Sequence, residues 1–305
     1  MVYQDPLTLD TITATNWKNS VLDIIFNALA ESDVLVDCLV FKGARVLNKR
    51  LDSFSRQSLD IDSNMLKEFV DKHQAYKELR DILEKEIELA INNYFERQSP
   101  VTYELNTIKI TKKPHKDRNH KLGWDAFEVT ISVRDLSRTS MRGLPNLKID
   151  ISAPEDLGED SIAPLNIGNS SVKAYSLERI AGEKLRAFLS SLPEYRKKVS
   201  KPGNAIRAKD LYDISQILKQ YPITQDIFWN KVGEEFLRAC QSRYIDCEGI
   251  KTFAKEMTVT EETFNSEPSI PKDISFNDVW NALTDIIEKF ERTKITPFNY
   301  PLPNA

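Results

Sequence analysis

Cysteine and histidine are scarce in this chain. There are three residues of each kind: Cys38, Cys240 and Cys247, and His73, His115 and His120. The cysteines are odd in number and scattered, without a C-x-x-C pair, which argues against a disulfide framework and against a structural zinc site. Three histidines are too few for a histidine-rich metal cluster. We therefore expect any bound metal to be a hard ion held by carboxylates.

Long apolar runs are also missing. No stretch of eighteen apolar residues occurs, so we expect no membrane span and no membrane partner. Residues 1–10 lack the basic and apolar regions of a signal peptide, which predicts a cytoplasmic protein. The chain is 41% hydrophobic and 29% charged, as is typical of soluble globular proteins. Its 305 residues are enough for one large or two ordinary domains.

The net charge is only −4, so no global field attracts nucleic acid, but basic residues gather in two places. The first basic cluster comprises Lys109, Lys112, Lys113, His115, Lys116, Arg118, His120 and Lys121. The second basic cluster comprises Arg196, Lys197, Lys198, Lys201, Arg207 and Lys209. Solvated surface is the simpler interpretation of both clusters, and a patch that follows phosphates is the alternative.

Hydrophobic periodicity predicts a mixed first half and a helical second half. The predicted elements of the first half are a helix over 16–31, a buried strand over 35–41, a short helix over 44–51, a strand over 58–62, one helix or two over 66–97, and strands over 102–111, 125–134 and 147–152. Residues 153–170 contain two prolines and two glycines and predict a long loop or linker. Helices are predicted over 176–191, 207–220, 226–242 and 276–292, with a loop over 264–273. We therefore expect one domain over 1–170 and a helical domain over 171–305.

Two acids of the second predicted strand share one face. Asp60 and Asp62 are separated by one residue, and side chains alternate along a strand, so both carboxylates point the same way, together with Ser58. At short range two such charges repel by about 1–4 kcal/mol, depending on the effective dielectric. A divalent cation removes that cost, and Mg²⁺ or Mn²⁺ bound with nucleotide phosphates suits such ligands. An isolated D-x-D is nevertheless more often the solvated face of an edge strand.

Asp150 strengthens the case for a metal site. It lies in the alternating segment 147–152, whose other face carries Ile149 and Ile151. If this strand is a neighbour of the strand with Asp60 and Asp62, three carboxylates converge. Such a triad suits metal-assisted phosphoryl transfer. Taken alone, Asp150 is more often an exposed strand residue.

Two charged residues stand beside apolar stripes of predicted helices. Lys184 follows Leu177 by seven positions and Ile180 by four, which predicts either a snorkelling side chain or a lysine that reaches a triphosphate. Asp210 precedes Ile214 by four positions, which predicts either a first-turn acid favoured by the helix dipole or a functional carboxylate.

A small-residue pair joins the first strand to the short helix. Gly43 and Ala44 allow a backbone to approach a phosphate, and a helix N-terminus favours anions. This pair is weak evidence by itself.

In order, these pieces resemble the AbiEii/AbiGii family of nucleotidyltransferase toxins, of the polymerase-β-like superfamily. The matching segments are F-K-G-A-R-V-L at 41–47, R-Q-S-L-D-I-D at 56–62, L-K-I-D-I-S at 147–152, S-L-E-R-I-A-G-E-K-L-R-A at 176–187 and R-A-K-D-L-Y-D-I at 207–214. The resemblance implies an α+β fold, with a mixed nucleotidyltransferase sheet followed by an all-helical C-terminal domain that completes the active-site cleft.

The resemblance also implies roles for single residues. Asp60, Asp62 and Asp150 would be catalytic and would bind Mg²⁺ or Mn²⁺, and Lys184 would contact the nucleotide. Asp210 would activate or position the acceptor hydroxyl. The nucleotide site would further include Gly43, Ala44, Arg56 and Ser58, and Arg56 would either pair with phosphate or hold the acidic strand in place. The family usually has Gly-Gly where Gly43-Ala44 stands, and Arg-Asp where Lys209-Asp210 stands, so the phosphate loop and the last motif differ here.

The expected activity is transfer of a nucleoside monophosphate from a nucleoside triphosphate to an acceptor hydroxyl, with release of pyrophosphate. By resemblance the protein would be the toxin of a bacterial toxin–antitoxin or phage-defence system, with RNA, including a tRNA 3′ end, as acceptor and a cognate antitoxin as partner. Two alternatives stay open: a small-molecule or protein acceptor, and a non-catalytic nucleotide-binding relative.

Overall fold

A computed structural model of the protein describes residues 11–52, 56–73, 75–114, 125–200 and 206–303. The chain packs as two compact units that alternate along the sequence. The sheet unit comprises residues 1–46, 57–155 and 163–174, and the helical unit comprises residues 47–56, 156–162 and 175–305. The expected boundary near residue 170 stays a prediction.

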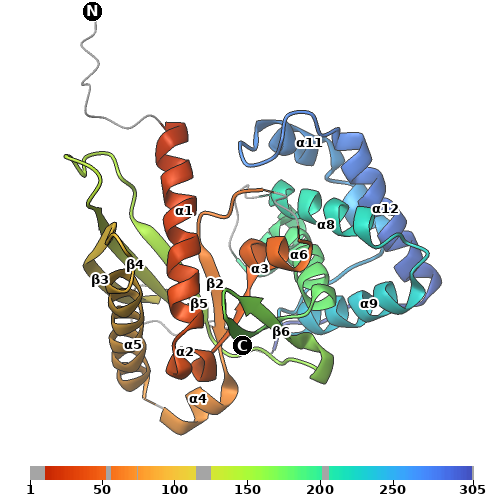
Figure 1. Ribbon diagram of the computed structural model, residues 1–305. Helices are drawn as coiled ribbons and strands as arrows, with labels where there is room; N and C mark the ends of the chain where they lie inside the picture. The colour runs from red at the N-terminus through yellow and green to blue at the C-terminus, as the bar shows by residue number, and fades with distance from the viewer. Residues whose placement is uncertain (1–10, 53–55, 74, 115–124, 201–205, 304–305) are drawn as a thin grey trace, which may run out of the picture. The chain divides into compact units, whose positions relative to one another are not determined.

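The sheet unit is built on seven strands in the order β3-β4-β5-β2-β1-β7-β6 (Figure 1). In chain order they are β1 (Leu39–Lys42), β2 (Ile61–Met65), β3 (Tyr103–Lys113), β4 (Ala126–Asp135), β5 (Leu147–Ser152), β6 (Ile162–Ile167) and β7 (Ser170–Tyr175). The pairs β2–β5 and β1–β7 are parallel, whereas β1–β2, β3–β4 and β4–β5 are antiparallel. The sheet is therefore mixed, as expected.

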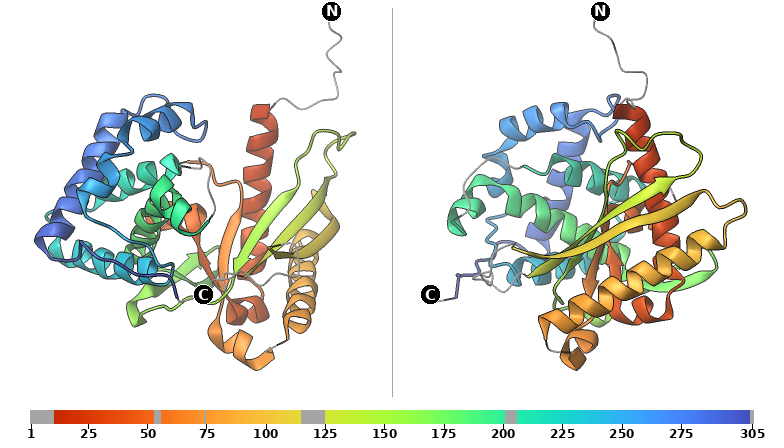
Figure 2. Two further views of the ribbon diagram at one scale, coloured as in Figure 1. Left: turned by 180° about the vertical axis from the view of Figure 1, so that it is seen from behind. Right: turned by 90° about the vertical axis from the view of Figure 1, so that its left-hand side faces the viewer.

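Alternation along the strands separates an apolar face from a polar one. On β5, Leu147, Ile149 and Ile151 are fully buried, and Lys148 and Asp150 lie on the opposite face. The helices α1 (Thr11–Ala30) and α5 (Tyr76–Glu96) lie against one face of this sheet (Figures 1 and 2), and the apolar side chains of the strands are buried there. The same unit contains α2 (Asp33–Cys38), α4 (Lys67–His73) and the start of α3 (Gly43–Arg50). The polar face, which carries Lys148 and Asp150, is the opposite face of the sheet.

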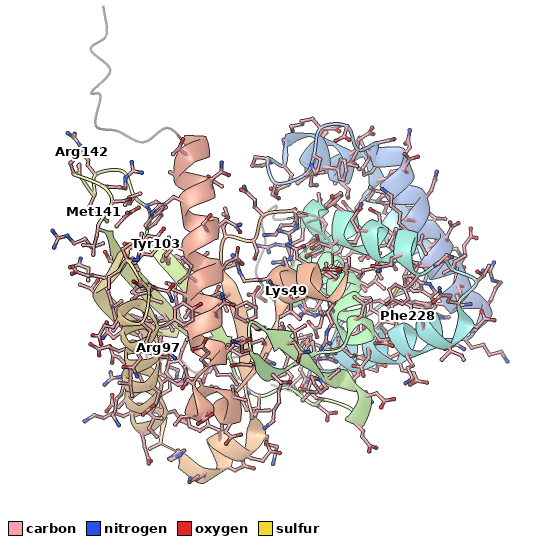
Figure 3. All side chains as sticks on the ribbon, in the orientation of Figure 1. Lys49, Arg97, Tyr103, Met141, Arg142 and Phe228 are labelled. Carbon is pink, nitrogen blue, oxygen red and sulfur yellow. The ribbon has the colours of Figure 1, made fainter. Side chains whose placement is uncertain are left out.

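The helical unit contains α6 (Leu177–Ser191), α7 (Pro193–Lys198), α8 (Ala208–Gln220), α9 (Asp226–Gln241), α10 (Ile250–Ala254), α11 (Met257–Ser266) and α12 (Phe276–Arg292). Its core is aromatic: Trp229, Phe236 and Phe290 are fully buried. At the start of α9, Phe228 (Figure 3) stacks on Tyr221 with ring centroids 4.4 Å apart. A Cβ at Gly182 would lie 2.7 Å from the Phe236 nitrogen, so glycine lets α6 and α9 pack closely. None of the helices in the described ranges has the length and apolar content needed to cross a bilayer.

Several sequence-based expectations are confirmed. The strand over 147–152 and the helix over 276–292 have the predicted bounds. The helical pattern over 66–97 is two helices in series, α4 and α5. In each of these segments the hydrophobic residues keep one period over the whole element, which is why the sequence predicts the right type of structure.

Other expectations were wrong. Residues 33–38 form a helix, α2, because the Ser32 hydroxyl caps it by accepting a hydrogen bond from the Leu35 amide, and the strand begins only at Leu39. The strand predicted over 58–62 begins at Ile61, and Leu59 is exposed rather than paired with Ile61 on the buried face. The predicted linker over 153–170 contains β6, which is an edge strand of the sheet, the place in a sheet where proline is tolerated.

Candidate functional site

Three carboxylates converge on the polar face of the sheet unit. Asp60, Asp62 and Asp150 each offer one oxygen, and these oxygens lie within 4.8 Å of one another. Asp62 and Asp150 are register partners on the parallel strands β2 and β5, and Asp60 lies just before β2. All three side chains are half-buried. The sheet adjacency on which the predicted triad depended is therefore present.

The chemistry of this donor set fits a hard divalent cation. Carboxylate oxygens are the ligands that Mg²⁺ and Mn²⁺ prefer, and Mg²⁺ lies about 2.0–2.1 Å from each ligand oxygen, so oxygens a few ångströms apart can share one ion. Within the described ranges no other three Asp, Glu, His or Cys side chains bring ligand atoms so close. Asp60, Asp62 and Asp150 are the residues that would hold such an ion.

Gly43 packs directly against the triad. It begins α3 with a φ of +80°, and a Cβ there would lie 2.8 Å from the carboxylate carbon of Asp62. A side chain at this position therefore meets two obstacles, the left-handed backbone and the Asp62 carboxylate. Ala44, which replaces the second glycine of the expected pair, is buried in the first turn of α3.

Ser58 and Arg45 shape the segment that leads to Asp60. The buried Arg45 donates a hydrogen bond from Nη2 to the Ser58 carbonyl oxygen over 2.6 Å, and its Nη1 pairs with Asp23 of α1. The Ser58 hydroxyl in turn donates to the Asp60 carboxylate over 3.3 Å. Ser58, expected near phosphates, is thus a buried neighbour of the first acid. Its nucleotide contact stays a prediction.

One lysine contacts the triad directly, and two more lysines lie near it. Lys113 of β3 lies 3.2 Å from Asp150 and 2.5 Å from Glu128 of β4, and Lys148 lies 3.1 Å from Glu128. The hydrogen bond from Lys113 holds the pKa of Glu128 below its usual range, against the effect of partial burial. Burial, together with the charge of Lys148, lowers the pKa of Lys18, while Asp60 acts in the opposite direction.

A second group of charges is buried in the helical unit. The Lys184 ammonium lies 2.9 Å from Asp210 and 2.7 Å from Asp213, and both carboxylates are fully buried. Arg56 forms a bidentate pair with Asp213 through two bonds of 2.8 Å, and Arg207 binds Asp210. We call these five residues the buried charge cluster; four of them are buried, and the Arg207 side chain reaches the cluster from an exposed position. Three cations and two anions leave it with one net positive charge.

The pKa values of this cluster follow from its pairs. Burial alone would raise the pKa of Asp210, but the cations Lys184 and Arg207 hold that pKa well below its usual range. Burial would likewise lower the pKa of Lys184, but Asp210 and Asp213 outweigh it, so the pKa is raised. Both side chains are therefore charged in the folded protein at neutral pH.

Sequence reasoning missed part of each group. Asp213 was not singled out, although it stands three positions after Asp210 on the same helix and next to the apolar Ile214. Arg207 was considered only as a member of the second basic cluster. Lys113 was likewise considered only within the first basic cluster, and Glu128 carried no signal except its alternation with Phe127 and Val129 on β4.

The two basic clusters are described only in part. Lys109, Lys112 and Lys113 lie on β3, whereas residues 115–121 of the first cluster lie outside the described residues. In the second cluster, Arg196, Lys197 and Lys198 form the end of α7, and Lys201 lies outside the described residues. Lys198 is paired with Asp246 at 2.7 Å.

The sequence and the fold of the chain were both compared with those of known proteins. The family model of the nucleotidyl transferase AbiEii toxin, type IV toxin–antitoxin system, matches residues 27–297, which confirms the resemblance. JHP933 from Helicobacter pylori has a similar fold, with a TM-score of 0.52 and 17% identity over 94% of this chain and 97% of that one. No curated protein matches the chain.

Two further solved structures are similar at lower scores. The nucleotidyltransferase toxin MenT4 from Mycobacterium tuberculosis H37Rv is 14% identical over 91% of this chain and 84% of that one, with a TM-score of 0.42. An antigenic nucleotidyltransferase-like protein from Paracoccidioides brasiliensis is 14% identical over 77% of this chain and 90% of that one, with a TM-score of 0.36.

Proposed function

Because this chain belongs to the AbiEii family of nucleotidyltransferase toxins, we propose that it transfers a nucleoside monophosphate from a nucleoside triphosphate to an RNA hydroxyl, such as a tRNA 3′ end. The acceptor oxygen would attack the α-phosphate, and pyrophosphate would leave. The observation that carries this proposal is the carboxylate triad, with three ligand oxygens within 4.8 Å of one another.

The proposed metal ligands are Asp60, Asp62 and Asp150. Mg²⁺ or Mn²⁺ bound there would neutralise charge that develops on the phosphate oxygens. Gly43 supports this assignment, because its bare backbone leaves room for the Asp62 carboxylate beside the start of α3. The proposal extends the nucleotide site to Ala44, Ser58 and Arg56.

The buried charge cluster supplies the second part of the proposal. Lys184 would contact the nucleotide, and Asp210 would position the acceptor hydroxyl. The salt bridge between them, at 2.9 Å, keeps both charged and in fixed orientation. The net positive charge of the cluster favours a phosphate ligand over a neutral one.

RNA is the proposed acceptor because β3, the strand that carries Lys113, also carries other basic side chains. Lys109 and Lys112, which stand on β3 with Lys113, are cations of the kind that follow a phosphate backbone. A small-molecule or protein acceptor is the alternative, and the salt dependence of the reaction separates the two. Transfer to RNA should weaken steeply with added salt, whereas transfer to a small acceptor should not.

The biological setting is proposed from the family. A toxin of a type IV toxin–antitoxin system implies an antitoxin partner, and we propose action in the cytoplasm and in defence against phage. Growth arrest on expression that is relieved by the product of a neighbouring gene would support that setting.

The direct test is label transfer from each of the four α-³²P nucleoside triphosphates to total bacterial RNA with Mg²⁺. Asp62→Asn is the test variant, and Asp71→Asn is the matched control, because Asp71 is an exposed acid of α4 whose ion pair within the described ranges is with Lys67. We expect labelled RNA with the parent and Asp71→Asn, and none with Asp62→Asn. Equal labelling by Asp62→Asn would overturn the proposal, and transfer only to protein or small molecules would replace the RNA acceptor.

A further inference from the structure

Lys113 is a cation placed on a proposed metal ligand. Its ammonium lies 3.2 Å from Oδ1 of Asp150 and 2.5 Å from Oε2 of Glu128. Glu128 and Asp150 are register partners on β4 and β5, and Asp150 is in turn the partner of Asp62 on β2. Lys113 therefore stands at the end of a row of three acids, with two of them as direct partners.

The sheet itself allows this reach. Lys113 is on β3, two strands away from β5, so its side chain must cross β4. Its register partner on β4 is Ala126, whose methyl group leaves space for the lysine stem. Glu128 comes two residues later on the same face and accepts the ammonium beside Asp150. Lys148 lies 3.1 Å from the same Glu128 oxygen, but no contact with Asp150 is seen for it.

Lys113 and a divalent ion at the triad would compete for the Asp150 carboxylate. A divalent ion held by Asp60, Asp62 and Asp150 needs an oxygen of Asp150, and Lys113 is attracted to the same group. On the basis of the metal-dependent transfer proposed above, we propose that Lys113 is a positioning residue, which orients Asp150 and weakens its affinity for the metal. Glu128 is the alternative partner, which holds Lys113 when Asp150 binds the ion.

Metal binding without nucleotide tests this directly. Free Mn²⁺ is measured by electron paramagnetic resonance during titration of the full chain. We expect Lys113→Met to bind Mn²⁺ about threefold to tenfold more tightly than the parent, because one competing charge near the ion is removed. Glu128→Gln should bind more weakly, since Lys113 then has only Asp150. In the Lys113→Met background, Glu128→Gln should lose most of its effect.

Two lysine variants control for the general loss of charge. Lys148→Met removes a cation from the same face, whose ion pair among the described residues is with Glu128. Lys112→Met removes the cation next to Lys113 in sequence, which pairs with Asp125 at 3.4 Å. Both should change Mn²⁺ affinity by less than twofold. Lys113→Arg should restore an affinity close to that of the parent, and thermal melting of each variant reports whether it is folded.

The outcomes separate this inference from the proposed function. If the parent binds Mn²⁺ and Lys113→Met binds no more tightly, the role of Lys113 is wrong and the metal site stands. If Lys148→Met tightens binding as much as Lys113→Met, the effect is a general field and the inference fails as well. If the parent binds no Mn²⁺ at all, the metal centre and the inference both fail.

Discussion

Asp62 and Asp150 face each other across neighbouring parallel strands, with Asp62 on β2 in register with Asp150 on β5. Register partners on neighbouring strands point to the same side of a sheet, so both carboxylates lie on the polar face. Asp60 adds a third carboxylate, and the three oxygens lie within 4.8 Å. Three carboxylates at this range repel one another, and a bound cation would offset that repulsion and stabilise the fold.

Removing one of these charges should therefore separate stability from activity. We expect Asp62→Asn to unfold at the same temperature as the parent or a few degrees higher in EDTA, because repulsion in the triad is relieved. With Mn²⁺ the parent should gain stability and the variant should gain much less. Transfer activity of the variant should fall at least about a hundredfold, as expected when transition-state charge loses its support.

Differential scanning calorimetry with and without Mn²⁺ measures both stability effects. Asp71→Asn serves as the control, since its carboxylate is exposed and paired only with Lys67 among the described residues. An Asp62→Asn protein that is clearly less stable than the parent in EDTA would mean that this carboxylate is held by stabilising partners rather than strained by its neighbours.

Gly43→Ala should damage the site without removing any carboxylate. The new methyl group would require a φ of +80° and would collide with Asp62, whose carboxylate carbon lies 2.8 Å from the Cβ position. We expect a loss of stability of about 1–3 kcal/mol and a large loss of Mn²⁺ affinity, because Asp62 must turn away. Urea unfolding and Mn²⁺ titration give the two values.

Ala44→Gly is the matched change at the next position. It restores the glycine pair usual in the family and should cost about 1 kcal/mol or less as a glycine in a helix. Mn²⁺ affinity should stay near that of the parent. If Gly43→Ala lowers Mn²⁺ affinity no more than Ala44→Gly does, the close approach of Gly43 to Asp62 is not needed for metal binding.

The buried charge cluster should dominate the acid stability of the helical unit. Lys184 and Arg207 hold the pKa of Asp210 well below its ordinary value of 3.8, although burial opposes this. Asp210 therefore binds protons more readily in the unfolded chain, so its contribution is complete above that ordinary pKa and is lost as the pH falls toward the folded pKa. Asp210→Asn should flatten the decline of unfolding free energy between pH 5 and pH 3 relative to the parent, by roughly one proton.

Lys184→Met should be more costly than an exposed lysine change. Asp210 keeps Arg207 and Asp213 keeps Arg56, but each buried carboxylate loses its bond to Lys184, which is expected to cost about 1–3 kcal/mol at pH 7. Lys67→Met breaks the exposed Lys67–Asp71 pair and should cost about 1 kcal/mol or less. Similar losses in the two variants, measured by urea unfolding, would mean that the cluster is effectively solvated.

Asp62 and Asp150 could be predicted from the sequence because a strand has a simple period, whereas Asp60 lies just before β2 and so outside the strand on which its prediction was based. Parity alone puts Asp150 on the face opposite Ile149 and Ile151, and those neighbours are fully buried. Lys184 was found as a charge beside an apolar stripe. Both signals are local and need no knowledge of which elements pack together.

What could not be predicted depends on contacts between distant positions. Arg56 and Asp213 are 157 residues apart, and nothing in either segment shows that they pair. Lys113 reaches Asp150 across β4, where its register partner is the small Ala126, and the sequence of either strand does not show this pairing. The helix α2 was mistaken for a strand because a short apolar run fits both structures, and the cap at Ser32 decided the outcome.

The cysteines provide a final test of packing. Cys38, Cys240 and Cys247 are free and buried, and burial raises the pKa of Cys38 and of Cys247 to about 11 and that of Cys240 well above its ordinary value. At pH 8 only about one thiol in a thousand would then be thiolate, the form that reacts with disulfide reagents. We expect no rapid reaction with Ellman's reagent in the native protein and three reactive thiols per chain in guanidinium chloride. A thiol that reacts within seconds in buffer would show that its part of the core opens readily, and fewer than three in denaturant would mean that a disulfide had formed.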